Sequence, residues 1–336
     1  MILVTGVAGF IGFHLAKKLL AMGFDVYGLD NLNDYYDVSL KEARLAELLP
    51  NRKFTFEKID LVDQNNILEL FQKHSFEYVI HLAAQAGVRY SITNPHAYTK
   101  SNLVAFMNVL EAIRHYPVRH FLFASSSSVY GGNKVTPFKT DHNVDHPVSL
   151  YAATKKSNEL LAHAYAHLYN IPTTGLRFFT VYGPFGRPDM AYFLFSEAIS
   201  QDKPIKVFNN GKLERDFTYI DDVVTAIVNL LDYLPSCVKE YDESVNSVSE
   251  SFAPFKIYNI GNNTPISLMT FIETLEKHLG KRATKEFVSM QQGDVQTTWA
   301  DVGDLEKTIS YKPSTSLDEG LEKFVEWYKD YYKIGD

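Results

Sequence analysis

The 336-residue sequence has a single cysteine, Cys237, and no long apolar run. One cysteine cannot form a disulfide within the chain, so nothing in the sequence requires an oxidising compartment. No apolar stretch approaches the roughly 20 residues that span a bilayer, and no signal peptide precedes the strand-like segment "MILVTG". A formal net charge of −7 argues against non-specific binding to nucleic acid. We therefore expect a cytoplasmic protein with no membrane or nucleic-acid partner.

What the sequence does contain is an alternation of short apolar runs with helical patterns. The runs are "MILVTG", "DVYGLD", "FTFEKID", "YVIHLAA", "HFLFASS" and "TTGLRFF", and the first helix is expected over residues 13–22. This alternation predicts an α/β fold with a doubly wound parallel sheet of the Rossmann type. We expect residues 1–176 to form this first domain, with a return of part of residues 216–260. Loops rich in Gly and Pro follow, so residues 177–215 and 261–336 are expected to form a smaller C-terminal α/β domain that binds the substrate.

The segment "TGVAGFIG" places Gly6, Gly9 and Gly12 three residues apart between a strand and a helix. Such glycines allow a tight turn and a close approach of the backbone to a pyrophosphate, although an ordinary βα turn is the alternative. The next strand ends at Asp30, where a carboxylate can accept hydrogen bonds from both adenosine ribose hydroxyls. Because no Arg or Lys directly follows Asp30 and no Gly-Lys-Ser/Thr follows the turn, NAD is favoured over NADP and over a Walker-type site.

The segment "YAATK" supplies Tyr151 and Lys155, four residues apart on one face of an amphipathic helix. A tyrosine ordinarily ionises near ~10. A lysine ammonium beside the phenol, together with a positive nicotinamide ring, would stabilise the phenolate and make the tyrosine a general base near neutral pH.

Together, "TGVAGFIG", "SSSSVYG" and "YAATK" resemble the extended short-chain dehydrogenase/reductase superfamily, and specifically its nucleotide-sugar epimerases. By its position relative to "VYG" and Tyr151, Ser126 matches the family's catalytic Ser/Thr, which hydrogen-bonds the reacting sugar hydroxyl. Similar dehydratases and decarboxylases carry acids at the places of Ser127 and Ser128. The resemblance therefore implies oxidation followed by return of the hydride, without elimination or decarboxylation.

Further segments sharpen the resemblance to the UDP-glucuronate 4-epimerases over residues 1 to about 332. They are "DNLNDYYD", "HLAAQAGVRYS", "GRPDMA", "RDFTYIDD" and "YNIGN". The implied cofactor contacts are Gly6, Gly9, Phe10, Ile11, Gly12, Asp30, Asn31, Asp60, Leu61, Leu82, Ala83, Ala84, Gln85, Tyr151 and Lys155. The implied substrate contacts are Arg89, Ser127, Ser128, Thr180, Arg187, Val207, Arg215 and Asp294. For Asp60, a place near the adenine amino group and a helix-capping role both remain open.

The sequence departs from the pattern in two places. Phe13 replaces a small residue in the first helix, which is expected to affect packing only. Gln291 and Gln292 precede "GDV" where galactose-type relatives have an arginine, and this leaves the ribose and phosphate contacts of UDP less defined.

The implied reaction is the NAD-dependent 4-epimerisation of UDP-glucuronate to UDP-galacturonate through a 4-keto intermediate. One alternative is epimerisation of a neutral UDP-hexose, such as UDP-glucose or UDP-N-acetylglucosamine. Another is a non-catalytic NAD-sensing regulator, because a fold does not fix a function. The histidines show no spacing typical of a metal site. Helices over residues 94–115 and 149–169 match those that pair in dimeric relatives, so we expect a homodimer.

Overall fold

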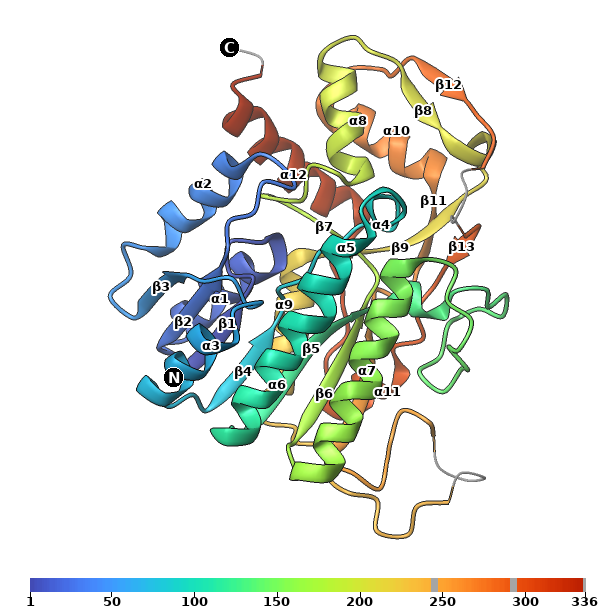
Figure 1. Cartoon of the computed structure of the whole chain (residues 1–336). Coiled ribbons are helices and arrows are strands. Elements are labelled where there is room, and N and C mark those ends of the chain that lie inside the picture. The colour runs from blue at the N-terminus through green and yellow to red at the C-terminus, as the bar shows by residue number, and fades with distance from the viewer. Residues whose placement is uncertain (243–246, 291–294, 335–336) are drawn as a thin grey trace.

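The computed structural model of the chain describes residues 1–242, 247–290 and 295–334 (Figure 1). Its main element is a seven-stranded parallel sheet with the strand order β10-β6-β5-β4-β1-β2-β3. The strands are β1 (Ile2–Thr5), β2 (Val26–Asp30), β3 (Phe54–Lys58), β4 (Tyr78–His81), β5 (His120–Ser126), β6 (Thr173–Phe178) and β10 (Phe255–Ile260). The doubly wound sheet predicted from the sequence is therefore present, and a strand from late in the chain completes one of its edges.

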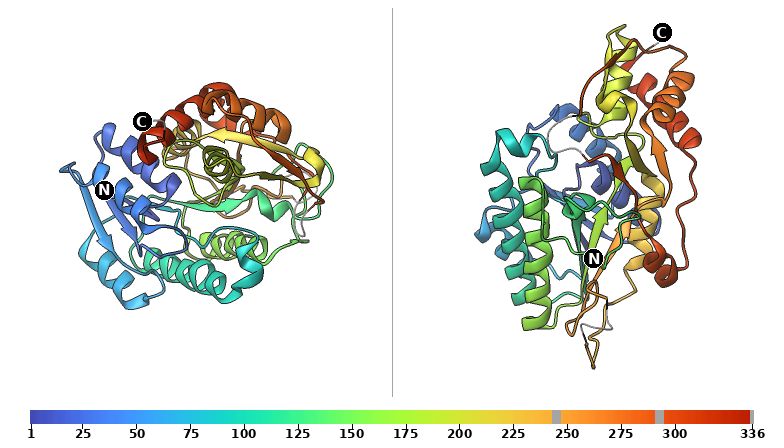
Figure 2. Two further views of the ribbon diagram at one scale, coloured as in Figure 1. Left: turned by 90° about the horizontal axis from the view of Figure 1, so that it is seen from above. Right: turned by 90° about the vertical axis from the view of Figure 1, so that its right-hand side faces the viewer.

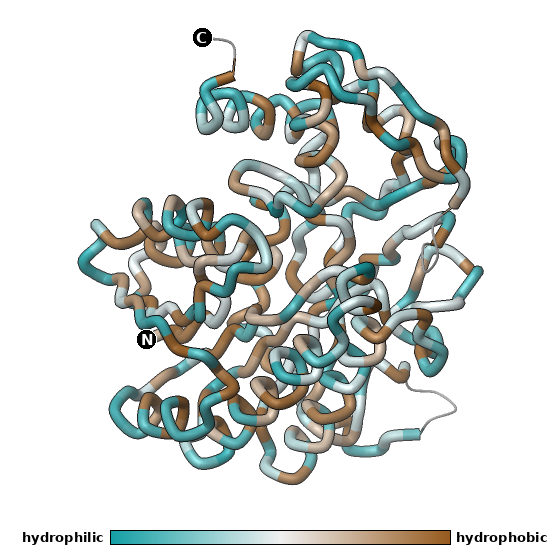
Figure 3. The backbone as a smooth tube through the Cα atoms, turned by 45° about the horizontal axis from the view of Figure 1, so that its top comes forward, coloured by the Kyte–Doolittle hydropathy of each residue, from teal (hydrophilic) through white to brown (hydrophobic). Residues whose placement is uncertain are grey.

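Helices cover both faces of this sheet, which gives three layers (Figure 2). On one face α1 (Phe10–Ala21) packs against α9 (Ile220–Leu230) and α2 (Val38–Leu48). On the other face α6 (Ala105–His115) packs against α3 (Gln64–Lys73) and α7 (Leu150–Tyr169). The apolar residues between the layers form two clusters, one under each set of helices. Figure 3 shows how apolar and polar stretches alternate along the backbone.

A smaller region lies beyond the carboxyl ends of the large sheet (Figure 1). It contains β7 (Thr180–Tyr182), β9 (Glu214–Tyr219), β11 (Pro265–Ser267) and β13 (Thr297–Thr298) in one sheet, and β8 (Ile205–Val207) with β12 (Lys285–Phe287) in another. Its helices are α8 (Ala191–Ser200), α10 (Leu268–Leu279) and α12 (Leu317–Tyr332), whereas α11 (Gly303–Ile309) packs against β10 and α9 of the large sheet. The short helices are α4 (Tyr90–Thr93), α5 (Pro95–Tyr98), η1 (Thr99–Val104), η2 (Ser127–Tyr130) and η3 (Phe208–Gly211).

Local sequence signals set several of these boundaries. The side chain of Ser149 accepts a hydrogen bond from the backbone N–H of Ala152 and so begins α7. Asp63 does the same for α3, so the helix cap is Asp63 and not Asp60. Helix α1 begins at Phe10, three residues before the predicted start at residue 13, because the extended backbone of Gly9 already serves as its N-cap.

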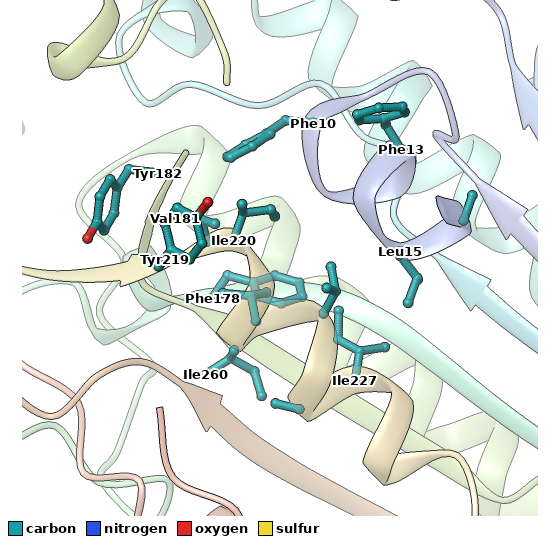
Figure 4. Close-up of a cluster of buried hydrophobic side chains, with 14 of the residues drawn as sticks. Phe10, Phe13, Leu15, Phe178, Val181, Tyr182, Tyr219, Ile220, Ile227 and Ile260 are labelled. Atoms are coloured by element: carbon teal, nitrogen blue, oxygen red, sulfur yellow. The ribbon is translucent and has the colours of Figure 1, made fainter. Parts of the chain in front are cut away.

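Phe13 is fully buried, as expected for a residue that affects packing, and its ring lies 4.9 Å from that of Phe185. Figure 4 shows the surrounding apolar cluster, in which side chains of α1 meet those of β6, β10 and α9. This cluster joins the first helix to segments more than 160 residues later in the chain. No helix in the described ranges is long and apolar enough to cross a membrane.

Candidate active site

A cavity of about 680 Å³ opens at the carboxyl ends of the parallel strands, where ligands bind in doubly wound folds. Its lining comes from the β1–α1 turn, the ends of β2, β4 and β5, the start of α7, and the loop before α8. It brings together every predicted site residue except Val207 and Asp294. Asp294 lies outside the described residues. Val207 is fully buried in β8, whereas its neighbour Phe208 lines the cavity.

The β1–α1 turn accepts only glycine at two of its positions. Gly6 has φ +72°, and a Cβ there would lie 2.8 Å from the backbone nitrogen of Ala83. A Cβ on Gly12 would overlap the carbonyl oxygen of Gly6. The turn therefore presents bare backbone and the first N–H groups of α1 to the cavity, which fits a diphosphate group.

Two carboxylates lie at the far end of this turn. Asp30 accepts hydrogen bonds from the backbone N–H groups of Ala8 (3.2 Å) and Leu32 (2.9 Å), which fixes its orientation at the end of β2. Asp60 accepts a hydrogen bond from the Asn31 amide at 3.2 Å and lines the cavity, so the structure favours the cavity-lining role over the capping role. The fold also brings Lys41 within 4.0 Å of Asp30, a cation that inspection of the residues directly after Asp30 missed.

The serine hydroxyls at the end of β5 fall into two groups: one is bonded inside the protein, and the others face the cavity. Ser125 donates to the buried carboxylate of Glu159 at 2.7 Å, and Glu159 in turn forms an ion pair with Arg177. Ser126 Oγ donates to Ser128 Oγ at 3.0 Å and accepts from the Ser128 backbone N–H at 3.2 Å. Ser126, Ser127 and Ser128 line the cavity. The first serine therefore holds α7 to the sheet, and the other three are available to a ligand.

Tyr151 and Lys155 enter the cavity from the first turns of α7. Burial raises the pKa of Tyr151, and a hydrogen bond with Ser126 and the charge of Arg187 oppose this rise. Lys155 Nζ donates to the carbonyl oxygen of Ala124 at 2.8 Å, and burial lowers its pKa to about 8. Within the chain, Ser126 and Arg187 therefore oppose the rise in the pKa of Tyr151, and the role of Lys155 beside the phenolate stays a prediction.

Arg187 forms a two-point ion pair that the sequence did not indicate. Its Nε and Nη2 atoms donate to the two carboxylate oxygens of Asp189 at 3.0 and 2.5 Å. The phenol of Tyr35, from the loop after β2, donates to the same carboxylate at 3.1 Å. All three residues line the cavity.

The loop that carries Arg187 is attached to the first two helices of the chain. The fully buried guanidinium of Arg44, on α2, donates to the carbonyl oxygens of Phe185 (2.7 Å), Gly186 (3.2 Å) and Ala8 (2.8 Å). His14, on α1, forms a hydrogen bond with the carbonyl oxygen of Pro184 at 2.9 Å. Arg44 thus links the glycine-rich turn to the Arg187 loop.

The remaining predicted residues, Arg89, Thr180 and Arg215, also line the cavity. Arg89 lies over the ring of Phe208, 5.3 Å from its centroid. Arg215 donates to the backbone carbonyl oxygens of Glu214 and Gln296 at 2.8 and 3.0 Å. Thr180 is the first residue of β7 and is only partly buried.

Comparison with known proteins agrees with this site. The NAD dependent epimerase/dehydratase family matches residues 2–261. The chain is 55% identical to Protein CapI of Staphylococcus aureus over 99% of each chain. It is 48% identical to a probable UDP-glucuronate 4-epimerase of Rhizobium meliloti, covering 98% of this chain and 97% of that protein.

A solved structure extends the comparison to three dimensions. The UDP-glucuronic acid 4-epimerase from Bacillus cereus, in complex with UDP-glucuronic acid and NAD, superposes with a TM-score of 0.87 at 36% sequence identity, covering 98% of this chain and 99% of that one. Because the family matches most of the sequence and such relatives align along nearly its whole length, this chain belongs to the NAD dependent epimerase/dehydratase family.

Proposed function

We propose that the protein is an isomerase that interconverts UDP-glucuronate and UDP-galacturonate with tightly held NAD. The observation that carries this proposal is the composition of one cavity: Ser126, Tyr151 and Arg187 line it together, Arg187 is close enough to Tyr151 to act on its pKa, and positions 127 and 128 carry hydroxyls. The similar proteins named UDP-glucuronate 4-epimerase support the same reaction.

The residues of the β1–α1 turn fit NAD. Gly6, Gly9 and Gly12 would hold the diphosphate, and Asp30 would accept the adenosine ribose hydroxyls. Asp60 and Leu61 would lie at the adenine, and Leu82 to Gln85 would line the path toward the nicotinamide. NAD, when bound, takes a hydride from C4 of the sugar and returns it, so it is regenerated in each turnover.

The protein's own residues handle the proton and the sugar. Tyr151 accepts the proton of the 4-hydroxyl through Ser126 and gives it back after the sugar has turned in the cavity. Lys155 supplies a buried positive charge on the strand side of the same helix. The nearby charge of Arg187 favours the phenolate form of Tyr151 and so contributes to its role as a base.

The intermediate sets a further requirement on the site. A ketone at C4 lies β to the C6 carboxylate, and such acids lose CO₂ when the breaking bond aligns with the carbonyl π-system. We propose that Ser127, Ser128, Thr180 and Arg187 hold the carboxylate out of that alignment. Charge-assisted hydrogen bonds of this kind contribute roughly 1.5–3 kcal/mol each.

The other end of the substrate has fewer defined contacts. We propose Arg215 as a diphosphate ligand and Arg89, which also lines the cavity, as a second cationic ligand. Val207 and Asp294 remain proposed uridine contacts, with the qualification that the Val207 side chain points into the core, so only its backbone is suited to this role. By this assignment, residues 177–215 and 261–336 hold the UDP-sugar, and residues 1–176 with part of 216–260 hold NAD.

One experiment separates this proposal from its alternatives. Purified protein is incubated with UDP-glucuronate, UDP-glucose or UDP-N-acetylglucosamine, without added NAD, and the products are separated by chromatography. We expect conversion of UDP-glucuronate to UDP-galacturonate. Conversion of a neutral sugar alone would establish the first alternative, and binding without conversion of any sugar would establish the NAD-sensing regulator.

We also propose that the protein is a cytoplasmic homodimer that pairs through α6 and α7. Exposed apolar side chains lie on α7, among them Leu160 (59% exposed) and Leu168 (64%), and at the end of η1, directly before α6, where Val104 is 40% exposed. The exposed thiol of Cys237 suits a reducing compartment. Sedimentation of a monomer at micromolar concentration would rule out the dimer.

A further inference from the structure

Asp189 places a permanent negative charge in the part of the cavity that the substrate carboxylate is proposed to enter. Arg187 and Tyr35 both donate to it, and the charge of Arg187 holds its pKa below the ordinary value although burial acts in the opposite direction. The Arg187 and Asp189 side chains are each 26% exposed. Asp189 is therefore ionised at neutral pH and remains within reach of a ligand.

Asp189 occupies only part of the hydrogen-bonding capacity of the Arg187 guanidinium. Asp189 occupies the Nε and Nη2 edge of the guanidinium. In the described part of the chain, Nη1 makes no hydrogen bond, so the end of the guanidinium is available to a second carboxylate. A guanidinium can bind one carboxylate along each of these edges.

We propose that Asp189 is a specificity-determining residue that weakens the hold of Arg187 on the substrate carboxylate. This inference rests on the proposed function, because it requires a uronic acid in the cavity. Two carboxylates on one guanidinium repel each other, and the internal one cancels most of the charge that the substrate would otherwise meet.

A weakened hold serves the chemistry of this reaction. To be reduced on its other face, the 4-keto sugar must turn within the cavity before the hydride returns. An arginine without a counter-anion would bind the carboxylate most strongly in the starting orientation, and uniform tight binding of the ground state does not accelerate a reaction. The charge balance at Arg187 thus selects a uronate and still allows it to move.

A purely orienting role for Asp189 makes the opposite prediction. If Asp189 only holds Arg187 in place, replacing Asp189 lets the guanidinium move away from its position and weakens the binding of UDP-glucuronate. If Asp189 acts as a counter-anion, its neutralisation strengthens that binding. The sign of the change in affinity therefore distinguishes the two roles.

The test is Asp189→Asn, compared with wild type and with Tyr35→Phe, which removes a hydrogen bond to Asp189 but keeps its charge. Dissociation constants of UDP-glucuronate, UDP-glucose and UDP are measured by calorimetry on the NAD-loaded protein, together with kcat and KM. For Asp189→Asn we expect about tenfold tighter binding of UDP-glucuronate, or about 1.4 kcal/mol, with UDP and UDP-glucose changed less than about twofold. We expect kcat to fall, and Tyr35→Phe to stay within about threefold of wild type.

Weaker or unchanged binding of UDP-glucuronate by Asp189→Asn would overturn the inference. Asp189→Ser is measured in parallel, and circular dichroism shows which variants are folded. A wild-type protein that binds UDP-glucuronate without converting it would refute the proposed reaction, whereas the sign of the Asp189→Asn effect on binding would still decide the role of this residue.

Discussion

The buried ion pair between Glu159 on α7 and Arg177 on β6 attaches the helix that carries Tyr151 and Lys155 to the sheet. We expect its disruption to lower the free energy of unfolding. Both side chains are 2% exposed, and the guanidinium contacts both carboxylate oxygens, at 2.8 and 3.0 Å. Burial would raise the pKa of Glu159, but Arg177 lowers it below its ordinary value. The pair is therefore charged inside the protein.

Glu159→Gln keeps the shape of the side chain and removes its charge. Arg177 would then have only neutral acceptors: the amide oxygen of the substituted side chain, the Tyr130 hydroxyl at 3.1 Å and the Thr140 carbonyl oxygen at 3.4 Å, together with the face of the Tyr130 ring. Breaking a buried pair in this way costs about 3–5 kcal/mol, because an uncompensated charge stays buried. We expect a loss of this size in the free energy of unfolding.

The assay is urea unfolding followed by the fluorescence of the two tryptophans, with equal m-values required for a comparison of the variants. The control is the double variant Glu159→Gln/Arg177→Met, which removes both charges and is expected to regain most of the lost stability. A loss below about 1 kcal/mol in the single variant would refute the reasoning, since it would mean that the Arg177 charge is satisfied by its neutral partners.

Three further predictions concern the site and its surroundings. Tyr151→Phe removes the proposed base, so turnover is expected to fall by about 10²–10⁴-fold while NAD and UDP stay bound; a variant that keeps more than about a tenth of the activity would exclude Tyr151 as the base. Arg187→Ala is expected to weaken UDP-glucuronate binding much more than UDP binding and to raise the ratio of UDP-4-keto-pentose to UDP-galacturonate in mass spectra, whereas an unchanged ratio and affinity would remove Arg187 from the carboxylate site. Burial lowers the pKa of His14 to about 4, of His81 to about 3 and of His120 to about 4, so these rings stay neutral as the pH falls. The stability that they contribute is complete above about pH 6.5 and declines below it, and their imidazole NMR signals, assigned with His→Gln variants, should not titrate down to about pH 5; titration near 6.5 would contradict their burial.

The sequence carries strong local signals for the sheet and for one side of the cavity. The six apolar runs correspond to β1 to β6, and the glycine turn, Ser126, Tyr151 and Lys155 all line the cavity as predicted. These residues sit at strand ends and helix starts, where the direction of the chain dictates which way a side chain points.

Contacts between distant segments had no such signal. Tyr35 and Asp189 are 154 residues apart, and Arg44 and Phe185 are 141 apart, so neither pair forms a recognisable pattern. The serine-rich segment before β10 has the composition of a solvated loop, yet Ser249 and Ser251 are buried, and the Ser251 hydroxyl lies 2.6 Å from the His163 ring on α7. Composition predicts a loop but cannot show what the loop covers.

The attachment of the Arg187 loop to α1 and α2 has a consequence for chimaeric enzymes. A chimaera that exchanges the C-terminal region with that of a relative would bring a new loop to His14, Tyr35 and Arg44 of the old N-terminal region. Unless the incoming loop offers carbonyl oxygens to His14 and Arg44 and a carboxylate to Tyr35, these contacts are lost, and the guanidinium of Arg44 remains buried without its loop partners. By the proposed assignment of the sugar site, the minimal unit for transplanting sugar specificity is therefore discontinuous: it comprises the Arg187 loop, Tyr35 in the loop after β2, and the anchors His14 and Arg44 on α1 and α2. A junction between the proposed cofactor and substrate domains would separate these parts.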